Sequence, residues 1–356
     1  GHTGFKGAWL CHWLSELGAK VAGLSLPPPT RPSLFQVLGL ARRIEHHQGD
    51  IRDLGTIETI LARFRPQAVF HLAAQAIVRA AYEGPKETFD SNVGGTVNIL
   101  EAVRRHSAVQ AVVVCTSDKC YENRSLARGY REEDPLGGRD PYSASKACAE
   151  IVARAYAVSY FSNKGPSLAT VRAGNVIGGG DWARHRVVPD CVRAWSIGKP
   201  ALIRHPSAIR PWQHVLEPIS GYLELGTALL GVDKQSALDC AGEAFNFGPR
   251  SGGVYSVEDL VGGMIKFWPS ARWRHAGIRP DMPENSVLRL DSSKARRLLG
   301  WSAILTFTEA VAMTSEWYLA HRRGGRDLGA LTSEQTVRYL DLAAQRRKAL
   351  GTYRSE

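Results

Sequence analysis

Short apolar runs alternate with longer amphipathic stretches through the first half of the chain. Four runs have the length and composition of buried strands: Lys20–Ser25, Ala68–Ala73, Ala111–Cys115 and Leu168–Arg172. Two stretches between them carry apolar residues at helical spacing: Leu54–Phe64 and Asn92–His106. This alternation predicts βαβ units, and therefore an α/β fold with a doubly wound parallel sheet. Ligands of such sheets bind beyond the carboxyl ends of the strands.

The second half is less periodic and richer in glycine and proline. Its segments 199–204, 243–248 and 254–268 suggest a smaller mixed α/β lobe, and the chain from Arg322 onward is charged and helix-prone. We expect a Rossmann-type domain over residues 1–172, to which a segment near 207–235 returns. Residues 173–320 would then form the C-terminal substrate lobe, and residues 321–356 a helical arm.

Composition narrows the class of protein. The chain has 356 residues, 44% of them hydrophobic and 22% charged, as in ordinary globular proteins. No stretch approaches 18 consecutive apolar residues, which argues against a membrane partner, and no signal segment opens the chain. The six cysteines are scattered, with no C-x-x-C pair and no Cys/His cluster. We therefore expect neither a disulfide framework nor a metal site, and a cytoplasmic location.

The formal net charge of +11 has two interpretations. It could mark a surface that binds nucleotides or nucleic acid, or it could reflect solvated helix faces. The sequence has no run of five like charges and no alternation of aromatic and basic residues. A nucleic-acid partner is therefore disfavoured.

A glycine-rich turn opens the chain. Gly1, Gly4 and Gly7 form G-x-x-G-x-x-G, with Phe5 and Lys6 inside the motif and an amphipathic helix pattern directly after it. Glycines let backbone N–H groups approach a pyrophosphate, whose charge a helix N-terminus favours. The strand that should precede this turn is absent from the numbered sequence, so we expect the first strand of the sheet to be missing.

Other strand ends also suit a dinucleotide. Asp50 and Ile51, in "GDIRD", follow a predicted strand, and Asp50 could accept a hydrogen bond from adenine or simply cap a helix. The small residues Ala73 and Ala74, followed by Gln75, end another strand, as a backbone lying against a cofactor requires. The strand ending at Ser25 has no acidic residue for the ribose hydroxyls, so these residues leave both NAD and NADP open.

A tyrosine and a lysine four residues apart supply the first candidate chemistry. Tyr142 and Lys146, in "DPYSASKACAE", would share one face at the start of a helix. An ammonium beside a phenol favours the phenolate, which can remove a hydroxyl proton while hydride leaves the same carbon. A chance surface pair is the alternative, but the preceding glycine motif, "GDIRD" and strand-end "TS" occur in the expected order.

Several motifs together resemble one enzyme family: "GHTGFKG", "TSDKCYEN", "DPYSASKACAE", "VRAGNVIGGGDWA", "VVPD" and "IRPWQHVLEPISGYL". The chain resembles the nucleotide-sugar 4,6-dehydratases of the extended short-chain dehydrogenase/reductases, and most closely their CDP-glucose branch, from Gly1 to about Trp301. The resemblance implies tightly held NAD, with Asn92 and Thr116 beside it. It also implies a nucleotide-sugar substrate and a homodimer or higher homo-oligomer.

The resemblance implies a three-step reaction. Tyr142, assisted by Lys146 and Ser117, would oxidise the sugar at C4; water would leave across C5 and C6, and hydride would return to C6. CDP-glucose would thus become CDP-4-keto-6-deoxyglucose. Asp118 resembles the acid that protonates the departing hydroxyl. Lys119 stands where the dTDP-glucose branch has a glutamate base, and it could act as a neutral base or stabilise the enolate as a cation.

Four residues are candidates for substrate contacts by resemblance: Asn175 for a sugar hydroxyl or phosphate oxygen, Arg210 as the diphosphate clamp, and Arg186 and Arg204 as weaker candidates. The segment just before Leu288 differs from the His-rich stretch of the CDP branch. That loop helps to line the nucleotide pocket, so it bears on the choice of base.

Three other functions remain open. The enzyme could dehydrate a sugar nucleotide with another base or hexose, or it could be a 4-epimerase or decarboxylase of the same superfamily. Neither of the latter needs the Asp118–Lys119 pair. The chain could instead be an NAD-binding redox sensor, but a sensor has no need of the proton relay that Ser117, Tyr142 and Lys146 would form.

Overall fold

The computed structural model describes residues 1–356 except 125, 163–164, 232–237, 251–253, 278–286 and 353–356, and the side chains of 347–352. Its main sheet is parallel, with the strand order β10–β5–β4–β3. These strands span Ala244–Phe247 (β10), Ser167–Ala173 (β5), Ala111–Cys115 (β4) and Ala68–His71 (β3). A second parallel pair, β1 (Ala22–Ser25) and β2 (Glu45–Gln48), is not hydrogen-bonded to the main sheet in the described chain.

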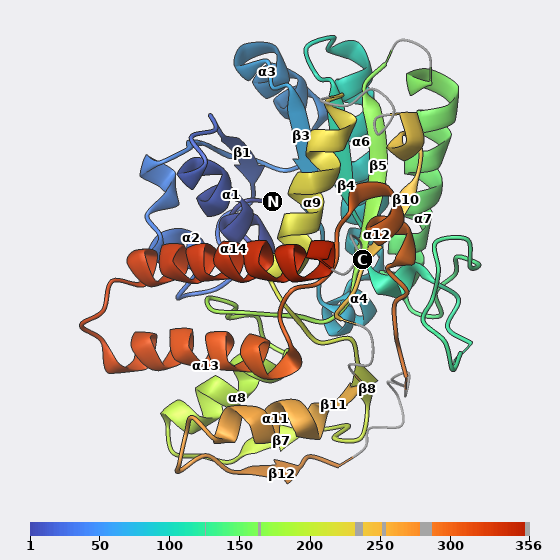
Figure 1. The fold of residues 1–356 in the computed structure, drawn as a ribbon. Coiled ribbons are helices and arrows are strands. Elements are labelled where there is room, and N and C mark those ends of the chain that lie inside the picture. The colour runs from blue at the N-terminus through green and yellow to red at the C-terminus, as the bar shows by residue number, and fades with distance from the viewer. Residues whose placement is uncertain (125, 163–164, 232–237, 251–253, 278–286, 353–356) are drawn as a thin grey trace.

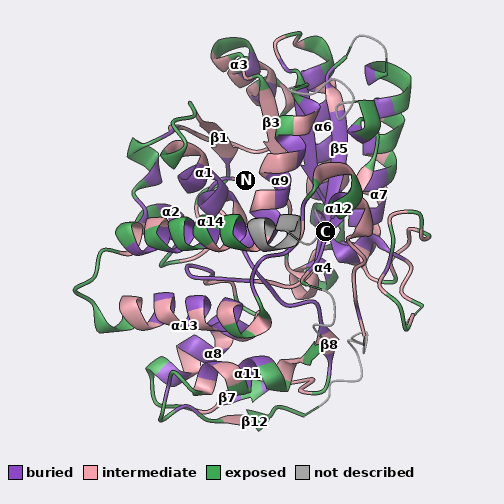
Figure 2. Ribbon diagram, viewed as in Figure 1, coloured by how far each residue is buried: buried purple, intermediate pink, exposed green. Residues whose placement is uncertain are grey.

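Alternate residues of β4 face two helical layers. Val112 and Val114 pack with α3, α6 and α7, whereas Ala111 and Val113 pack with α9. The helices of these layers, with the turns that extend them, are α3 (Leu54–Phe64), η2 (Asp90–Gly94), α6 (Gly95–Arg105), α7 (Pro141–Tyr156), η4 (Ala157–Phe161), α9 (Leu216–Leu229) and α12 (Ser293–Leu299). Burial on both faces explains the unbroken apolar run of β4. All its residues are buried, as Figure 2 shows for the centre of the main sheet.

The N-terminal helix α1 (Phe5–Glu16) contacts α9 and the C-terminal helix α14 (Leu328–Thr352). Five short helices lie between the longer elements of the Rossmann-type part: α2 (Leu34–Val37), η1 (Leu40–Arg42), α4 (Val78–Glu83), α5 (Pro85–Phe89) and η3 (Asp118–Cys120). Helix α14 also packs on α13 (Phe307–Arg323), and Figure 1 shows it lying between α1 and α13. The predicted C-terminal arm is therefore a helix that joins the two parts of the molecule.

The smaller lobe is mixed α/β, as expected. Its strands form three pairs: β7 (Ala201–Ile203) with β12 (Trp273–His275), β8 (Ile209–Arg210) with β11 (Tyr255–Ser256), and β6 (Val176–Ile177) with β9 (Gln213–His214). Its helices are α8 (Val187–Ser196), α11 (Val257–Ile265) and α13.

Two elements beyond residue 172, strand β10 and helix α9, lie in the Rossmann-type part. Our assignment of residues 243–248 to the smaller lobe is wrong, because β10 pairs with β5 in the main sheet. Helix α9, within the segment near 207–235, packs on β4 and β5. No helix in the described residues has the length and apolarity needed to cross a membrane.

Candidate active site

The chain leaves β4 at Cys115 and enters a short turn that carries three predicted catalytic residues. Ser117 caps this turn: its Oγ accepts a hydrogen bond from the backbone N–H of Lys119 at 3.3 Å and donates one to Asp118 Oδ1 at 3.1 Å. The turn lies at the carboxyl end of a central strand, where parallel sheets bind ligands. We call Thr116–Tyr121 the catalytic loop.

Helix α7 brings the other two catalytic residues to this loop. Asp140 caps the helix by accepting a hydrogen bond from the Ser143 N–H at 3.0 Å, which fixes Tyr142 in its first turn. Lys146 follows one turn later and is buried beside the end of β4. The Lys119 ammonium lies 6.0 Å from the centroid of the Tyr142 ring. The structure therefore gathers all five predicted catalytic residues around one space.

Asp118 has the electrostatics of an acid. Its side chain is buried, and burial raises the pKa of the carboxyl above its ordinary value. The charges of Lys119, Arg210 and Lys6 oppose this rise without cancelling it. Asp118 Oδ2 is buried without a hydrogen-bond partner in the described part of the chain. A carboxyl with a raised pKa keeps its proton nearer to neutral pH, where it can protonate a leaving group.

The pKa of Tyr142 moves opposite to our expectation. Burial raises it to about 12, and the hydrogen bond with Ser117 and the charge of Arg186 only partly offset this. Lys146 does not bond the phenol; its Nζ donates to the Cys115 carbonyl at 3.2 Å. Burial in turn lowers the pKa of Lys146 to about 8. Forming a phenolate at this site therefore requires more positive charge than these side chains supply.

Replacing Lys146 with methionine should stabilise the fold. The pKa of Lys146 falls from 10.5 to about 8, which corresponds to about 3 kcal/mol of folding free energy lost below pH 8 and regained as the pH rises from about 8 to 10.5. Losing the bond to Cys115 offsets about 1 kcal/mol of this. We expect Lys146→Met to raise the free energy of unfolding by about 1–2 kcal/mol in urea at pH 7. The exposed Lys86→Met is the control; equal or lower stability of Lys146→Met would contradict the burial argument.

The glycine turn holds the start of α1 close to the end of β3. A Cβ on Gly1 would lie 2.6 Å from the backbone nitrogen of Ala73, and one on Gly7 would lie 2.2 Å from the Gly1 carbonyl oxygen. Gly4 precedes α1 and makes no side-chain cap, so the first amides of the helix keep their donors for a ligand. These features fit the pyrophosphate of a dinucleotide.

Asn92 organises the loop that follows β3. Its Oδ1 accepts from the backbone N–H of Gln75 at 2.8 Å, and its Nδ2 donates to the Gln75 carbonyl at 3.0 Å and to Ser145 Oγ at 2.9 Å. Ser145 lies on α7 between the catalytic tyrosine and lysine. Asn92 therefore joins the predicted cofactor loop, which includes the half-buried Ala74, to the catalytic helix.

Other predicted cofactor residues have internal partners. Asp50 accepts hydrogen bonds from Arg52, which lower the pKa of its carboxyl, and Ile51 is buried against the start of α6. The Thr116 hydroxyl bonds Glu150 and the Val171 carbonyl. Thr116 therefore contributes to the interior under the site, a role that the sequence did not suggest.

Lys6 reaches from α1 into the same space. Its Nζ lies 3.5 Å from the hydroxyl of Tyr222 on α9, and burial lowers its pKa. Phe5 lies against the glycine run, where a Cβ on Gly178 would be 3.2 Å from its ring. We missed Tyr222 because it comes from the returning helix, 80 residues beyond Tyr142 in the chain.

Two of the four candidate substrate-binding residues carry charges that affect the pKa values of catalytic residues. Arg186 is paired with Asp181 at 2.9 Å, and its charge acts on Tyr142. The charge of Arg210 acts on Asp118. Asn175 is half-buried at the start of the glycine run, and its carbonyl accepts from the Gln213 N–H.

Arg204 follows strand β7 and acts near Arg186. Its charge acts on His185, whose pKa is lowered first by burial. Residues 279–286, which we expected to help line the nucleotide pocket, lie outside the described residues.

Comparison with known proteins identifies relatives of this chain. The sequence pattern of the NAD dependent epimerase/dehydratase family matches residues 1–236. CDP-glucose 4,6-dehydratase of Salmonella typhimurium is 47% identical over 330 residues, which cover 91% of this chain and 90% of that protein.

Solved structures share the fold. UDP-glucose 4-epimerase of Thermotoga maritima superposes with a TM-score of 0.78 at 21% identity, covering 91% of this chain and 98% of that one. A double mutant of dTDP-glucose 4,6-dehydratase from Streptomyces venezuelae, with NAD bound, gives 0.75 at 25% identity, covering 90% and 96%. The Rossmann-type fold predicted from the alternating pattern is thus confirmed. This chain belongs to the NAD dependent epimerase/dehydratase family.

Proposed function

We propose that this protein is an NAD-dependent CDP-glucose 4,6-dehydratase, a lyase that yields CDP-4-keto-6-deoxyglucose. One observation carries the assignment: Asp118 and Lys119 lie beside Tyr142, so an acid and an ammonium group share the space in which the sugar would be oxidised. Epimerisation at C4 needs the oxidising tyrosine but no acid to expel water. The 47% identity to a CDP-glucose 4,6-dehydratase supports the same substrate.

The residues of the glycine turn and of the loop after β3 would hold the cofactor. Bound NAD supplies the hydride acceptor and a positively charged ring. A positive charge beside Tyr142 would stabilise the phenolate and so lower the pKa of the phenol, which burial raises to about 12. Ser117, which bonds the phenol, would orient the C4 hydroxyl toward Tyr142 as it loses its proton.

Elimination would follow from the position of the catalytic loop. A ketone at C4 acidifies the proton on C5, and Asp118 would give its proton to the C6 hydroxyl as it departs. Lys119 faces the same space and has two possible roles: a neutral Nζ would take the C5 proton, and a charged one would stabilise the enolate.

Two arginines would bind the diphosphate. The positive charge of Arg210 acts on Asp118, and the positive charge of Arg186 acts on Tyr142. A guanidinium fork suits phosphate oxygens. Asn175, on the loop after β5, would contact a sugar hydroxyl or a phosphate oxygen.

A homodimer or higher homo-oligomer accompanies this function in our proposal. Ile151, Val158 and Tyr160 are apolar side chains on α7 and η4 whose exposed fractions are 58%, 65% and 57%. Exposed apolar side chains gathered on one helical segment are typical of a contact surface. All six cysteines are unpaired, which fits the cytoplasm as the proposed location.

The substrate is tested by incubating the protein with NAD and, separately, CDP-glucose, dTDP-glucose, UDP-glucose and GDP-mannose. We expect mass spectrometry to show loss of one water from CDP-glucose, at a rate at least about tenfold above the others, because a base-specific pocket contributes 1.4 kcal/mol or more. Loss from another sugar nucleotide would keep the chemistry and change the base. No loss from any of them would favour the epimerase, decarboxylase and sensor alternatives.

A further inference from the structure

Glu150 is a buried carboxylate on α7, one helical turn beyond Lys146. Its Oε1 accepts a hydrogen bond from the hydroxyl of Thr116, the first residue of the catalytic loop. Its Oε2 accepts one from Thr170 Oγ1 at 2.6 Å and pairs with Arg172 Nη2 at 2.8 Å. The side chains of Glu150 and Arg172 are only 3% and 4% exposed, so this pair is shielded from solvent.

Arg172, on β5, holds the other end of the catalytic loop. Its Nη1 donates to the hydroxyl of Tyr121 at 2.8 Å, and its guanidinium carbon lies 4.8 Å from the centroid of that ring. Thr116 and Tyr121 flank the reactive residues of the loop on either side. One buried ion pair therefore contacts both ends of the loop and belongs to the helix that carries the oxidising tyrosine.

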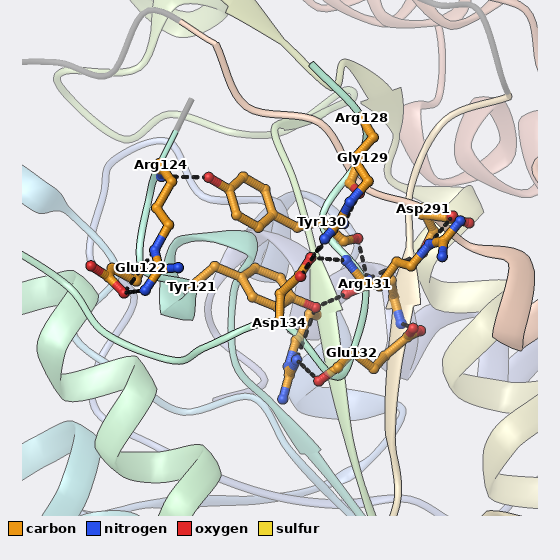
Figure 3. Close-up of polar contacts among 12 residues, drawn as sticks. Tyr121, Glu122, Arg124, Arg128, Gly129, Tyr130, Arg131, Glu132, Asp134 and Asp291 are labelled. Atoms are coloured by element: carbon orange, nitrogen blue, oxygen red, sulfur yellow. Dashed lines mark hydrogen bonds and ion pairs between the residues drawn. The ribbon is translucent and has the colours of Figure 1, made fainter. Parts of the chain in front are cut away.

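Tyr121 is also fixed from its outer side. Its hydroxyl donates to Asn246 Oδ1 at 2.7 Å, and its ring stacks on Tyr130 with centroids 5.1 Å apart. Figure 3 shows Tyr121 among the polar contacts of the residues that follow it, which include the ion pair of Arg131 with Asp291. The end of the loop is thus held by Asn246 and Tyr130 as well as by Arg172.

We propose that Glu150 and Arg172 are a positioning pair that sets the elimination machinery, Asp118 and Lys119, in register with the oxidising Tyr142. The inference rests on the proposed dehydratase function. Neither residue is placed to touch the reacting atoms. The two Nη atoms of Arg172 and both carboxylate oxygens of Glu150 have hydrogen-bond partners, whereas Arg172 Nε is buried without one in the described residues. Such buried contacts restrict the chain to one arrangement, and a misplacement of about 1 Å at a reacting group can cost about 10²-fold in rate.

The pair should matter more for elimination than for oxidation. Tyr142 and Lys146 keep their places on α7 through the helix itself, whereas the catalytic loop has only a single helical turn and depends on its two ends. Oxidation takes only Ser117 from the loop, whereas elimination takes both Asp118 and Lys119. Loosening the loop should therefore slow the loss of water much more than C4 oxidation. Reduced cofactor would then accumulate on the enzyme during turnover.

The test compares Glu150→Gln with the wild type, loaded with NAD. We expect dehydration of CDP-glucose to fall by about 10²-fold, C4 oxidation and KM to change by less than about fivefold, and bound reduced cofactor to accumulate. Amide hydrogen exchange should quicken in the catalytic loop and stay unchanged in β3 and α6. Glu316→Gln, which breaks an ion pair with Arg338 of the same 2.8 Å length, is the matched control and should alter neither measurement.

Two outcomes would overturn the proposal: oxidation and elimination falling in the same proportion, or exchange rising throughout the protein. Either would make the pair a general stabiliser of the fold. If Glu150→Gln does not fold, Tyr121→Phe removes only the hydroxyl that links Arg172 to the loop, and the same division between the two half-reactions is expected. If the wild type dehydrates no sugar nucleotide, the proposed function fails, while the exchange measurement still decides whether the pair positions the loop.

Discussion

Tyr142→Phe is expected to abolish turnover. Every later step depends on the ketone at C4, and phenylalanine cannot take the C4 hydroxyl proton as hydride leaves. Loss of a general base lowers rates by about 10²–10⁴-fold. Because no step precedes oxidation, the variant should form neither dehydrated product nor reduced cofactor when mixed with CDP-glucose and NAD. Stopped-flow absorbance of the reduced nicotinamide, followed by mass spectrometry of the sugar nucleotide, measures both.

The matched control is Tyr255→Phe, which removes a partly exposed tyrosine hydroxyl in the smaller lobe. It should retain wild-type rates to within about twofold, since surface substitutions have small effects. The ring of Tyr142 is buried and its packing is kept in phenylalanine, so the variant should fold and bind NAD. Rapid formation of reduced cofactor by Tyr142→Phe would show that another group is the base.

The local pattern of the chain predicted much of the fold. The boundaries of α3 and β4 match the expected ranges Leu54–Phe64 and Ala111–Cys115, because burial on fixed faces imposes a clear periodicity. The placement of β10 was wrong for a different reason. Its residues 244–247 read as a strand, but which sheet a short strand joins depends on contacts with β5, more than 70 residues earlier, and periodicity carries no such information.

The residues of the site were likewise only partly predictable from the sequence. Ser117, Asp118, Lys119, Tyr142 and Lys146 could be found because two short motifs contain them. The Tyr222 hydroxyl and the buried Arg172 come from elements that reach the site only in three dimensions. Glu150 had a usable signal, since it continues the spacing of four from Tyr142 through Lys146 and so lies on the same helical face. The raised pKa of Tyr142 could not be foreseen, because it depends on how deeply the fold buries the ring.

Asp118→Asn should separate the two halves of the reaction. Asparagine has nearly the same shape but no acidic proton, so the C6 hydroxyl would have to leave without protonation. Oxidation at C4 uses Tyr142 and should stay within about tenfold of the wild-type rate, whereas loss of water should slow by about 10²–10⁴-fold. Reduced cofactor formed in the first step would then remain on the enzyme, with a 4-keto sugar beside it. A single-turnover experiment that follows nicotinamide absorbance and product mass together measures both rates.

Glu122→Gln serves as the control, because it removes a carboxylate from the same stretch of chain that is exposed and paired with Arg124. Exposed pairs contribute about 0–1 kcal/mol, so this variant should behave as the wild type. The distinction rests on burial: Asp118 is shielded and its pKa is raised, which would allow it to carry a proton to the leaving group, whereas the pair at Glu122 is exposed to water. If Asp118→Asn loses water at the wild-type rate, Asp118 is not the acid. If it forms no reduced cofactor at all, Asp118 acts before elimination, and the division of labour between α7 and the catalytic loop is wrong.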